Sequence, residues 1–99
     1  MVINKQSNGE ELTVSLEGRL DTTTAPQLEA ELNDALNGVK KLVIDIDKLV
    51  YISSAGLRVL LKAQKTMNKQ GSMEVRNVST EIQDIFEVTG FDEILNIVK

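Results

Sequence analysis

The sequence predicts an α/β fold, in which helices pack on a mixed, mostly parallel β-sheet of four to five strands. Two observations lead to this prediction. Short apolar segments typical of strands alternate along the chain with segments of helical period. The segments between successive strands are also long enough to contain a helix, which makes the strands they join parallel. A length of 99 residues fits one domain. We therefore expect a single domain over residues 1–99 with the order β-β-α-β-α-β-α-β.

The first two elements are predicted to form a hairpin. Apolar and polar residues alternate over residues 11–17, which places Leu12, Val14 and Leu16 on one face of a half-buried strand. Residues 2–5 form a shorter candidate strand. The segment Ser-Asn-Gly at residues 7–9 is typical of a turn and would join the two strands.

The first helix and the central strand follow. Residues 22–26 read Thr-Thr-Thr-Ala-Pro, which predicts a hydroxyl N-cap and a proline in the first helical turn. The apolar residues that follow have helical spacing; they are Leu28, Leu32, Ala35 and Leu36. Asn-Gly at residues 37–38 is expected to end the helix. Residues 42–46 are β-branched and almost continuously apolar, as expected of a central strand covered on both faces.

The second half of the chain predicts two more helices and two more strands. A loop over residues 47–53 leads to a helix capped by Ser53 or Ser54 and ending near residues 69–71. This second helix carries a core stripe of Leu57, Leu60, Leu61, Gln64 and Met67. A strand over residues 73–78 follows. A third helix opens at residues 79–82 with the buried stripe Ile82, Ile85 and Phe86, and residues 94–98 form a last strand.

Composition excludes several classes of function. The chain has no Cys and no His, which excludes disulfides, Ser-His-Asp and Cys-His catalysis, and metal sites built on those ligands. Its net charge of −4 argues against binding to nucleic acid. No apolar run approaches the roughly 20 residues of a membrane span, and no signal peptide is visible. We expect a cytoplasmic binding or switch module, without a cofactor, rather than an enzyme.

The segment over residues 45–60 runs from the carboxyl end of the central strand into a helix N-terminus. Ligands and partners of open α/β sheets bind at this position. A phosphate on a serine there would meet free backbone N–H groups and would add about −1.5 to −2 charges. A serine before a helix is also among the commonest N-caps. Either Ser53 is the cap and Ser54 the exposed hydroxyl, or the reverse. Gly56 allows either a partner's close approach or the packing of two elements.

Three other groups of residues have two interpretations each. Val50 and Tyr51 either anchor their loop to the core or form an exposed contact patch. The basic residues Arg58, Lys62 and Lys65 form a solvated helix face or part of a partner surface. The carboxylates of Asp21, Asp45 and Asp47 suggest a metal pocket, but scattered carboxylates more often cap turns, so we expect no metal site.

At these residues the chain resembles a known family. Residues 52–57 read Ile-Ser-Ser-Ala-Gly-Leu, and they follow Leu-Val-Ile-Asp-Ile at residues 42–46. Gly-Arg-Leu-Asp at residues 18–21, with Thr24 and Ala25, lies about thirty residues before the Ser-Ala-Gly-Leu segment. Together these segments resemble the bacterial anti-sigma factor antagonists of the STAS domain family, and the resemblance covers essentially the whole chain.

The resemblance implies a STAS fold and a regulatory function in partner switching. Proteins of this family bind an anti-sigma factor that is also a serine kinase, and thereby release a sigma factor to regulate transcription. Phosphorylation of one serine abolishes the binding, and a PP2C-type phosphatase restores it. The family pattern places that serine at Ser54, with Ser53 in place of an aspartate and as a second possible acceptor. The resemblance adds a partner-binding set of Asp21, Thr24, Ser53, Ala55, Gly56, Leu57 and Arg58, in a monomer or weak dimer.

A second hypothesis is a STAS module that is not phosphorylated. Such a module would bind a small ligand or nucleotide, or would act as a subunit of a larger signalling assembly. Stoichiometric phosphate uptake at Ser54 would favour the switch. A ligand-dependent change in melting temperature without any kinase would favour the alternative.

Overall fold

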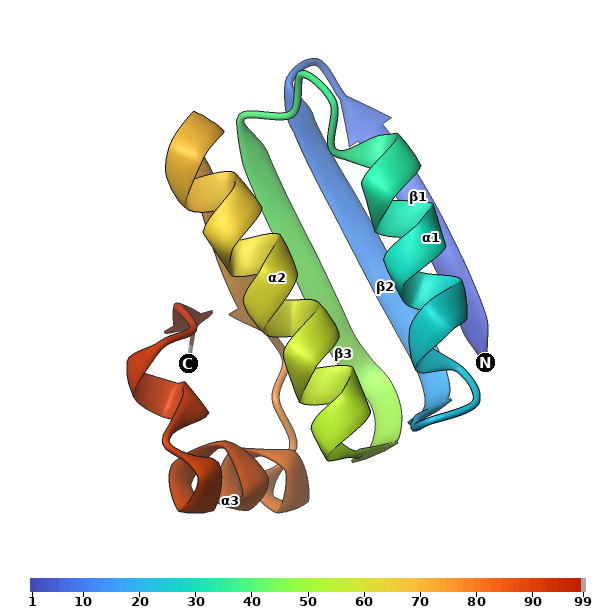
Figure 1. The fold of residues 1–99 in the computed structure, drawn as a ribbon, viewed down its shortest axis with the longest axis vertical. Helices are drawn as coiled ribbons and strands as arrows, with labels where there is room; N and C mark the ends of the chain where they lie inside the picture. Colours follow the sequence, from blue (N-terminus) through green and yellow to red (C-terminus); the bar gives the residue numbers. More distant parts are fainter. Residues whose placement is uncertain (99) are drawn as a thin grey trace.

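The computed structural model describes residues 1–98, and its helices and strands follow the predicted order (Figure 1). The strands are β1 (Val2–Asn8), β2 (Glu11–Leu20), β3 (Lys41–Ile52), β4 (Ser72–Arg76) and β5 (Ile97–Val98). The helices are α1 (Ala25–Ala35), α2 (Ser54–Gln70) and α3 (Thr80–Thr89), with a short 3-10 helix over Phe91–Glu93.

The five strands form one sheet in the order β1-β2-β3-β4-β5. β1 pairs antiparallel with β2, whereas β2, β3, β4 and β5 are mutually parallel. Each parallel connection passes through at least one helix, as such crossovers require. The predicted mixed, mostly parallel sheet is therefore confirmed.

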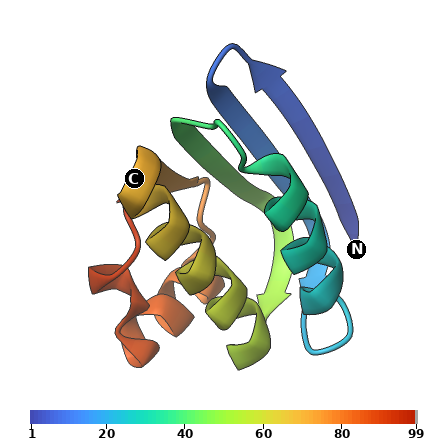
Figure 2. The ribbon, with the colours of Figure 1, turned by 45° about the horizontal axis from the view of Figure 1, so that its top comes forward.

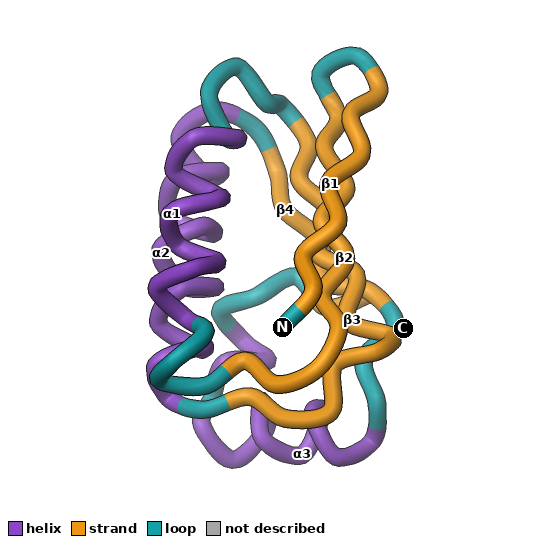
Figure 3. The backbone as a smooth tube through the Cα atoms, turned by 90° about the vertical axis from the view of Figure 1, so that its right-hand side faces the viewer, coloured by secondary structure: helices purple, strands orange, loops and turns teal. Residues whose placement is uncertain are grey.

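The helices lie at one face and at one end of this sheet. α1 and α2 run side by side over one face, and both begin at the end of the molecule that lies lowest in Figure 1 (Figures 1 and 2). α3 lies across that same end, as the side view shows (Figure 3). The core between the sheet and the helices is almost entirely aliphatic. Its fully buried side chains include Val14, Leu16, Leu20, Leu28, Ile44, Ile46, Leu60, Met67, Ile82 and Phe86.

The prediction that the central strand is covered on both faces is wrong. No helix of the described chain covers the opposite face of the sheet (Figure 3). Val43 is only 3% exposed there, but it does not belong to the core cluster of Leu42 and Ile44. Thr13 and Glu74 flank Val43 in the sheet register. Val43 is thus buried although no helix of the described residues covers this face of the sheet.

The hairpin turn is shorter than predicted. β1 continues to Asn8, which pairs with Glu11, so the turn consists of Gly9 and Glu10 rather than residues 7–9. Gly9 has a φ of 64°, in the left-handed region where glycine is favoured. The sequence therefore predicted a turn correctly, but the turn lies at residues 9–10 and shares only Gly9 with the predicted segment.

The loop predicted over residues 47–53 is instead the second half of β3. The strand continues to Ile52, and its register against β2 shifts twice, between Ser15 and Glu17 and between Gly18 and Arg19. Each shift places an extra β3 residue opposite β2, as in a β-bulge. The polar pair Asp47 and Lys48 lies at the first irregularity, where strict alternation of apolar and polar residues fails. This failure of alternation is why the pattern indicated a loop.

The last two strands are shorter than predicted. β4 ends at Arg76 because Asn77 has a φ of 60°, which stops the extended conformation. The strand predicted over residues 94–98 is reduced to Ile97–Val98, where it pairs with Val75 and Arg76. α3 begins after Ser79, whose side chain accepts a hydrogen bond from the Ile82 amide at 3.3 Å. The third helix is therefore capped where the sequence predicted.

Candidate phosphorylation site and partner surface

The candidate site lies where β2 and β3 end side by side. Leu20 and Ile52 are partners at the last position of the β2–β3 pairing. The next amide, of Ser53, donates a hydrogen bond to the Leu20 carbonyl at 2.9 Å. α1 and α2 both begin within five residues of these strand ends. The carboxyl end of the parallel sheet thus brings together the Asp21–Thr24 loop and the N-terminus of α2, as open α/β sheets do at their binding sites.

Ser53 is the N-cap of α2, which decides between the two capping alternatives. Its hydroxyl accepts a hydrogen bond from the Gly56 amide at 3.4 Å, and its carbonyl accepts the first helical bond from Leu57 at 2.9 Å. The backbone of Ser53 is extended, with φ −100° and ψ 175°, as an N-cap requires. Ser53 therefore has a structural function.

Ser54 is the first residue of α2 and is exposed to solvent. Its hydroxyl makes no hydrogen bond to any other residue of the described chain, 1–98. The adjacent end of the helix carries the partial positive charge of the helix dipole. A free hydroxyl at this position is accessible to a second protein, and the cap does not depend on it.

Gly56 and Leu57 are buried, so the packing interpretation of Gly56 holds. A Cβ at Gly56 would lie 2.6 Å from the Leu20 Cγ and 3.0 Å from the Ile52 Cγ1. Leu57 is 4% exposed and belongs to the core. Both residues belong to the partner-binding set that the resemblance implies, and this burial corrects their role. They hold α2 against the strand ends, and the side chains left for a partner here are those of Ser54, Ala55 and Arg58.

Asp21 organises the loop between β2 and α1. Its Oδ1 accepts hydrogen bonds from the Thr23 hydroxyl at 2.7 Å, the Thr23 amide at 3.0 Å and the Thr24 amide at 3.2 Å. Thr24 precedes the helix, but its hydroxyl does not cap the helix amides; it bonds to the Arg19 carbonyl at 2.8 Å. The predicted hydroxyl cap of α1 is thus replaced by a turn that the Asp21 carboxylate closes.

These bonds lower the pKa of Asp21. The main cause is the Thr23 hydroxyl, which bonds to the charged carboxylate; desolvation opposes the shift, and the Thr23 and Thr24 amides add to it. Since the folded-state pKa lies below the unfolded value of about 3.9, the carboxylate stabilises the fold above that pH. The contribution is lost as the pH falls through the folded-state pKa.

We therefore expect Asp21→Asn to lower the melting temperature slightly at pH 7 and not at all in acid. The amide oxygen of Asn retains an acceptor for the Thr23 and Thr24 groups but loses the charge that strengthens those bonds. Melting curves of both proteins between pH 7 and pH 2 measure the difference. A gap in melting temperature that persists unchanged in acid would show that the charge of Asp21 does not stabilise the turn.

A groove of about 430 Å³ lies between the N-terminal halves of α1 and α2, and Ala55, the residue after Ser54, lines it. Its walls are Thr22, Ala25, Pro26 and Glu29 on one side and Ala55, Arg58, Val59 and Lys62 on the other. Across it, the Lys62 ammonium lies 3.2 Å from the Glu29 carboxylate, and this pair is exposed. The groove joins the loop that Asp21 organises to the helix that carries Ser54.

Val50 and Tyr51 are exposed on the last part of β3, which excludes the interpretation that they anchor a loop to the core. Val50 is 69% exposed and Tyr51 is 37% exposed. The Arg19 guanidinium lies 4.4 Å from the centre of the Tyr51 ring, in a cation–π contact, and its Nε lies 3.7 Å from the Asp21 Oδ2. Sequence reasoning missed Arg19, because only the strand pairing places it beside Tyr51.

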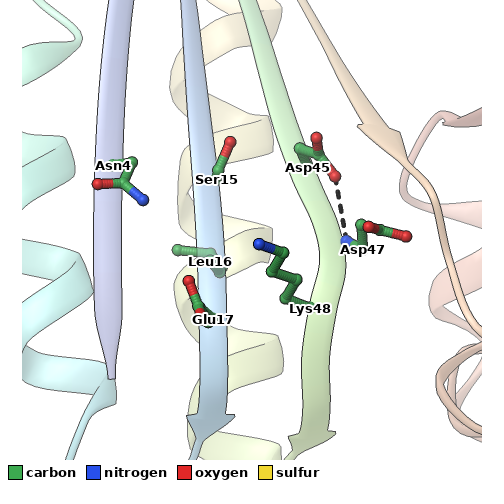
Figure 4. Close-up of a pocket in the computed structure, with 7 residues that line it drawn as sticks. All are labelled: Asn4, Ser15, Leu16, Glu17, Asp45, Asp47 and Lys48. Carbon is green, nitrogen blue, oxygen red and sulfur yellow. Dashed lines mark hydrogen bonds between the residues drawn. The ribbon is translucent and has the colours of Figure 1, made fainter.

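A separate hollow lies on the open face of the sheet (Figure 4). It has a volume of about 280 Å³ and forms at the first bulge of β3. The lining residues are Asn4, Ser15, Leu16, Glu17, Asp45, Asp47 and Lys48. The Asp45 Oδ1 accepts bonds from the Asp47 amide and from the Asn77 Nδ2, both at 3.0 Å. Asp45 thus holds the backbone of Asp47 and the side chain of Asn77. Asp21, the third aspartate of the suggested metal pocket, lies in another part of the molecule.

Two kinds of site have no candidate within residues 1–98. No group of three acidic side chains is placed so that it could hold a metal ion. Over the same residues, none of the helices is both long and apolar enough to cross a bilayer.

The chain matches the STAS domain family, described as "Mlab, STAS domain", over residues 3–98. The protein BtrV of Bordetella bronchiseptica is 36% identical to it over 88 residues, which cover 87% of this chain and 76% of BtrV. The anti-sigma-B factor antagonist of Bacillus subtilis is 28% identical over 96 residues, which cover 96% of this chain and 88% of the relative. The chain therefore belongs to the STAS domain family of anti-sigma factor antagonists.

Solved structures show the same fold. An anti-sigma factor antagonist from Mycobacterium paratuberculosis superposes with a TM-score of 0.88 at 23% identity, over 97% of this chain and 83% of that one. The Bacillus cell fate determinant SpoIIAA in its phosphorylated form superposes with a TM-score of 0.76 at 18% identity, over 99% and 92% of the two chains. At these identities the likeness is one of fold.

Proposed function

We propose that this protein binds an anti-sigma factor with serine kinase activity and thereby releases a sigma factor in the cytoplasm. Phosphorylation of Ser54 ends the binding, and a PP2C-type phosphatase restores it. The observation that carries the proposal is the division of roles between two adjacent serines. Ser53 makes the cap bond to Gly56, and the Ser54 hydroxyl is exposed and makes no bond within residues 1–98.

This division favours Ser54 over Ser53 as the phosphate acceptor. A phosphate on Ser53 would change the group that accepts the cap bond from the Gly56 amide, a bond worth about 1 kcal/mol to a helix. A phosphate on Ser54 leaves that bond in place and puts negative charge at the positive end of the α2 dipole. The fold can therefore accept the modification without rearrangement.

In the reaction, the Ser54 hydroxyl oxygen attacks the γ-phosphorus of ATP that the partner kinase holds. The bond between that phosphorus and the β,γ-bridging oxygen breaks, ADP leaves, and the hydroxyl proton passes to a base of the kinase. This chain supplies only the acceptor hydroxyl, and it acts as a regulatory protein rather than an enzyme.

The surface offered to the partner consists of Ser54, the groove between α1 and α2, and the exposed end of β3. The groove between α1 and α2 contributes Ala55 and Arg58, and the strand ends contribute Val50 and Tyr51. Thr24 and Asp21 shape the neighbouring loop, so their effect on binding is through the position of that loop. A dianionic phosphate on this surface would be costly to bury against a partner, which would explain the loss of binding.

The alternative of a small-ligand module has weaker support. Its best candidate is the hollow on the open face, where Asn4, Glu17, Asp47 and Lys48 are all exposed (Figure 4). A small-molecule site usually encloses most of its ligand between apolar walls. The lining of this hollow is polar and exposed, so it would not enclose a ligand in that way.

The test is phosphate uptake in vitro. The protein is incubated with the anti-sigma factor kinase of its own organism and with ATP, and intact mass is measured over time. We expect one phosphate per chain, no uptake by Ser54→Ala, and continued uptake by the matched variant Ser53→Ala. Uptake by Ser54→Ala equal to that of the natural protein would refute Ser54 as the acceptor.

A further inference from the structure

Arg58 lies one helical turn after Ser54 on the same face of α2. Residues four apart on a helix have Cβ atoms about 5–6 Å apart, within reach of a long side chain. Both residues are exposed, and Arg58 also lines the groove between α1 and α2. The order is the favourable one, since the acidic group would precede the basic group along the helix.

Arg58 differs from the other arginines in having no partner within the described chain. Arg19 contacts Tyr51 and Asp21, and Arg76 pairs with Glu74 at 2.6 Å. No ion pair or hydrogen bond within residues 1–98 holds the Arg58 guanidinium. It is a planar group with five donors, which suits bidentate binding to phosphate oxygens.

We propose that Arg58 binds the phosphate of phosphorylated Ser54 within the same chain, an inference that rests on the proposed function. In the unphosphorylated protein the guanidinium is free to contact the partner. After phosphorylation the phosphate holds it, so the surface gains a dianion and loses the use of its cation at the same time. Arg58 is thus a positioning residue of the switch. Its contact with the phosphate weakens partner binding more than the added negative charge alone would.

The charged groups of the neighbouring groove and loop pair with one another. Glu29 and Lys62 pair across the groove, and Arg19 and Asp21 pair in the neighbouring loop. These pairs place one positive and one negative charge together, so their fields at Ser54 partly cancel. The guanidinium of Arg58 lies one helical turn from Ser54 and has no partner in the described chain, so it is the cation expected to lower the pKa of the phosphate.

The experiment installs phosphoserine at position 54 of the full chain during translation, so that no kinase is required. Phosphorus NMR then follows the second pKa of the phosphate in the natural background and in Arg58→Gln. We expect the pKa to be higher in Arg58→Gln by about 0.3, the effect of a pair spaced i, i+4. Lys65→Gln is the matched control, because Lys65 lies about 16 Å from Ser54 along the helix axis. This variant should leave the pKa of the phosphate unchanged.

Two results would overturn the proposal. One is an equal phosphate pKa with and without the Arg58 side chain. The other is an equal rise in Arg58→Gln and Lys65→Gln, which would indicate a general effect of net charge. Circular dichroism of each variant checks that the helix is intact, as expected for an exposed substitution. Because the phosphate is installed directly, these results are separate from whether a cellular kinase phosphorylates Ser54.

Discussion

Replacing Ser54 by Asp is expected to weaken binding to the anti-sigma factor by about 100-fold or more. The fold should be unaffected, because the Ser54 hydroxyl makes no bond within the described chain and an acidic residue suits the first turn of a helix. The loss corresponds to roughly 3 kcal/mol, within the usual cost of an unpaired charge in an interface. Titration calorimetry with the purified anti-sigma factor measures the affinity, and thermal melting checks the fold.

The matched control for this prediction is Ser53→Asp. It adds the same charge one residue earlier, and aspartate is as good an N-cap as serine, so the bond from Gly56 is kept. We expect Ser53→Asp to bind within a few-fold of the natural protein. If both variants lost affinity equally, negative charge anywhere at this helix start would be sufficient, and Ser54 would have no special position.

The second large effect is expected for Gly71→Ala, at the end of α2. A Cβ at this residue would lie 1.8 Å from the carbonyl oxygen of Lys40 and 2.6 Å from its carbonyl carbon. That carbonyl accepts a bond from the Ser72 amide at 2.9 Å, and the Lys40 amide donates to Glu10 at 2.8 Å. Two backbone segments would have to separate to admit the methyl group, and the bonds that join them would be strained.

We expect Gly71→Ala to lower the free energy of unfolding by about 3 kcal/mol or more, the upper range for overpacking. The melting temperature should then fall by more than about 12 °C in a domain of this size. Urea unfolding of Gly71→Ala beside Ser72→Ala, its exposed neighbour, measures the effect. A loss below about 0.5 kcal/mol would mean that the two segments move apart easily and that the close contact does not stabilise the fold.

The sequence predicted the order of the elements because most of them carry a local signal. The alternation around Val14, the proline near the start of α1 and the serine caps of α2 and α3 are each decided within a few residues. The second half of β3 had no such signal. Its bulges break the alternation of apolar and polar residues, and the strand is held by pairing with β2, which lies more than twenty residues earlier.

The sequence was sufficient to predict where the candidate site lies, but not which role each of its residues has. The Ser-Ser pair marked the start of α2, yet only the geometry distinguishes the capping Ser53 from the exposed Ser54. Gly56 was open to two interpretations because its close neighbour, Leu20, is 36 residues away in sequence. The contact of Arg19 with Tyr51 likewise depends on the pairing of β2 with β3.

The most direct test of the switch is the state of Ser54 in the living cell. The protein is purified from its own organism under several growth conditions, its intact mass is measured, and any phosphate is located by peptide mapping. We predict a fraction heavier by one phosphate, carried on Ser54, that changes in size with the conditions. A chain that is unmodified in every condition, or that carries its phosphate on Ser53, would contradict the account.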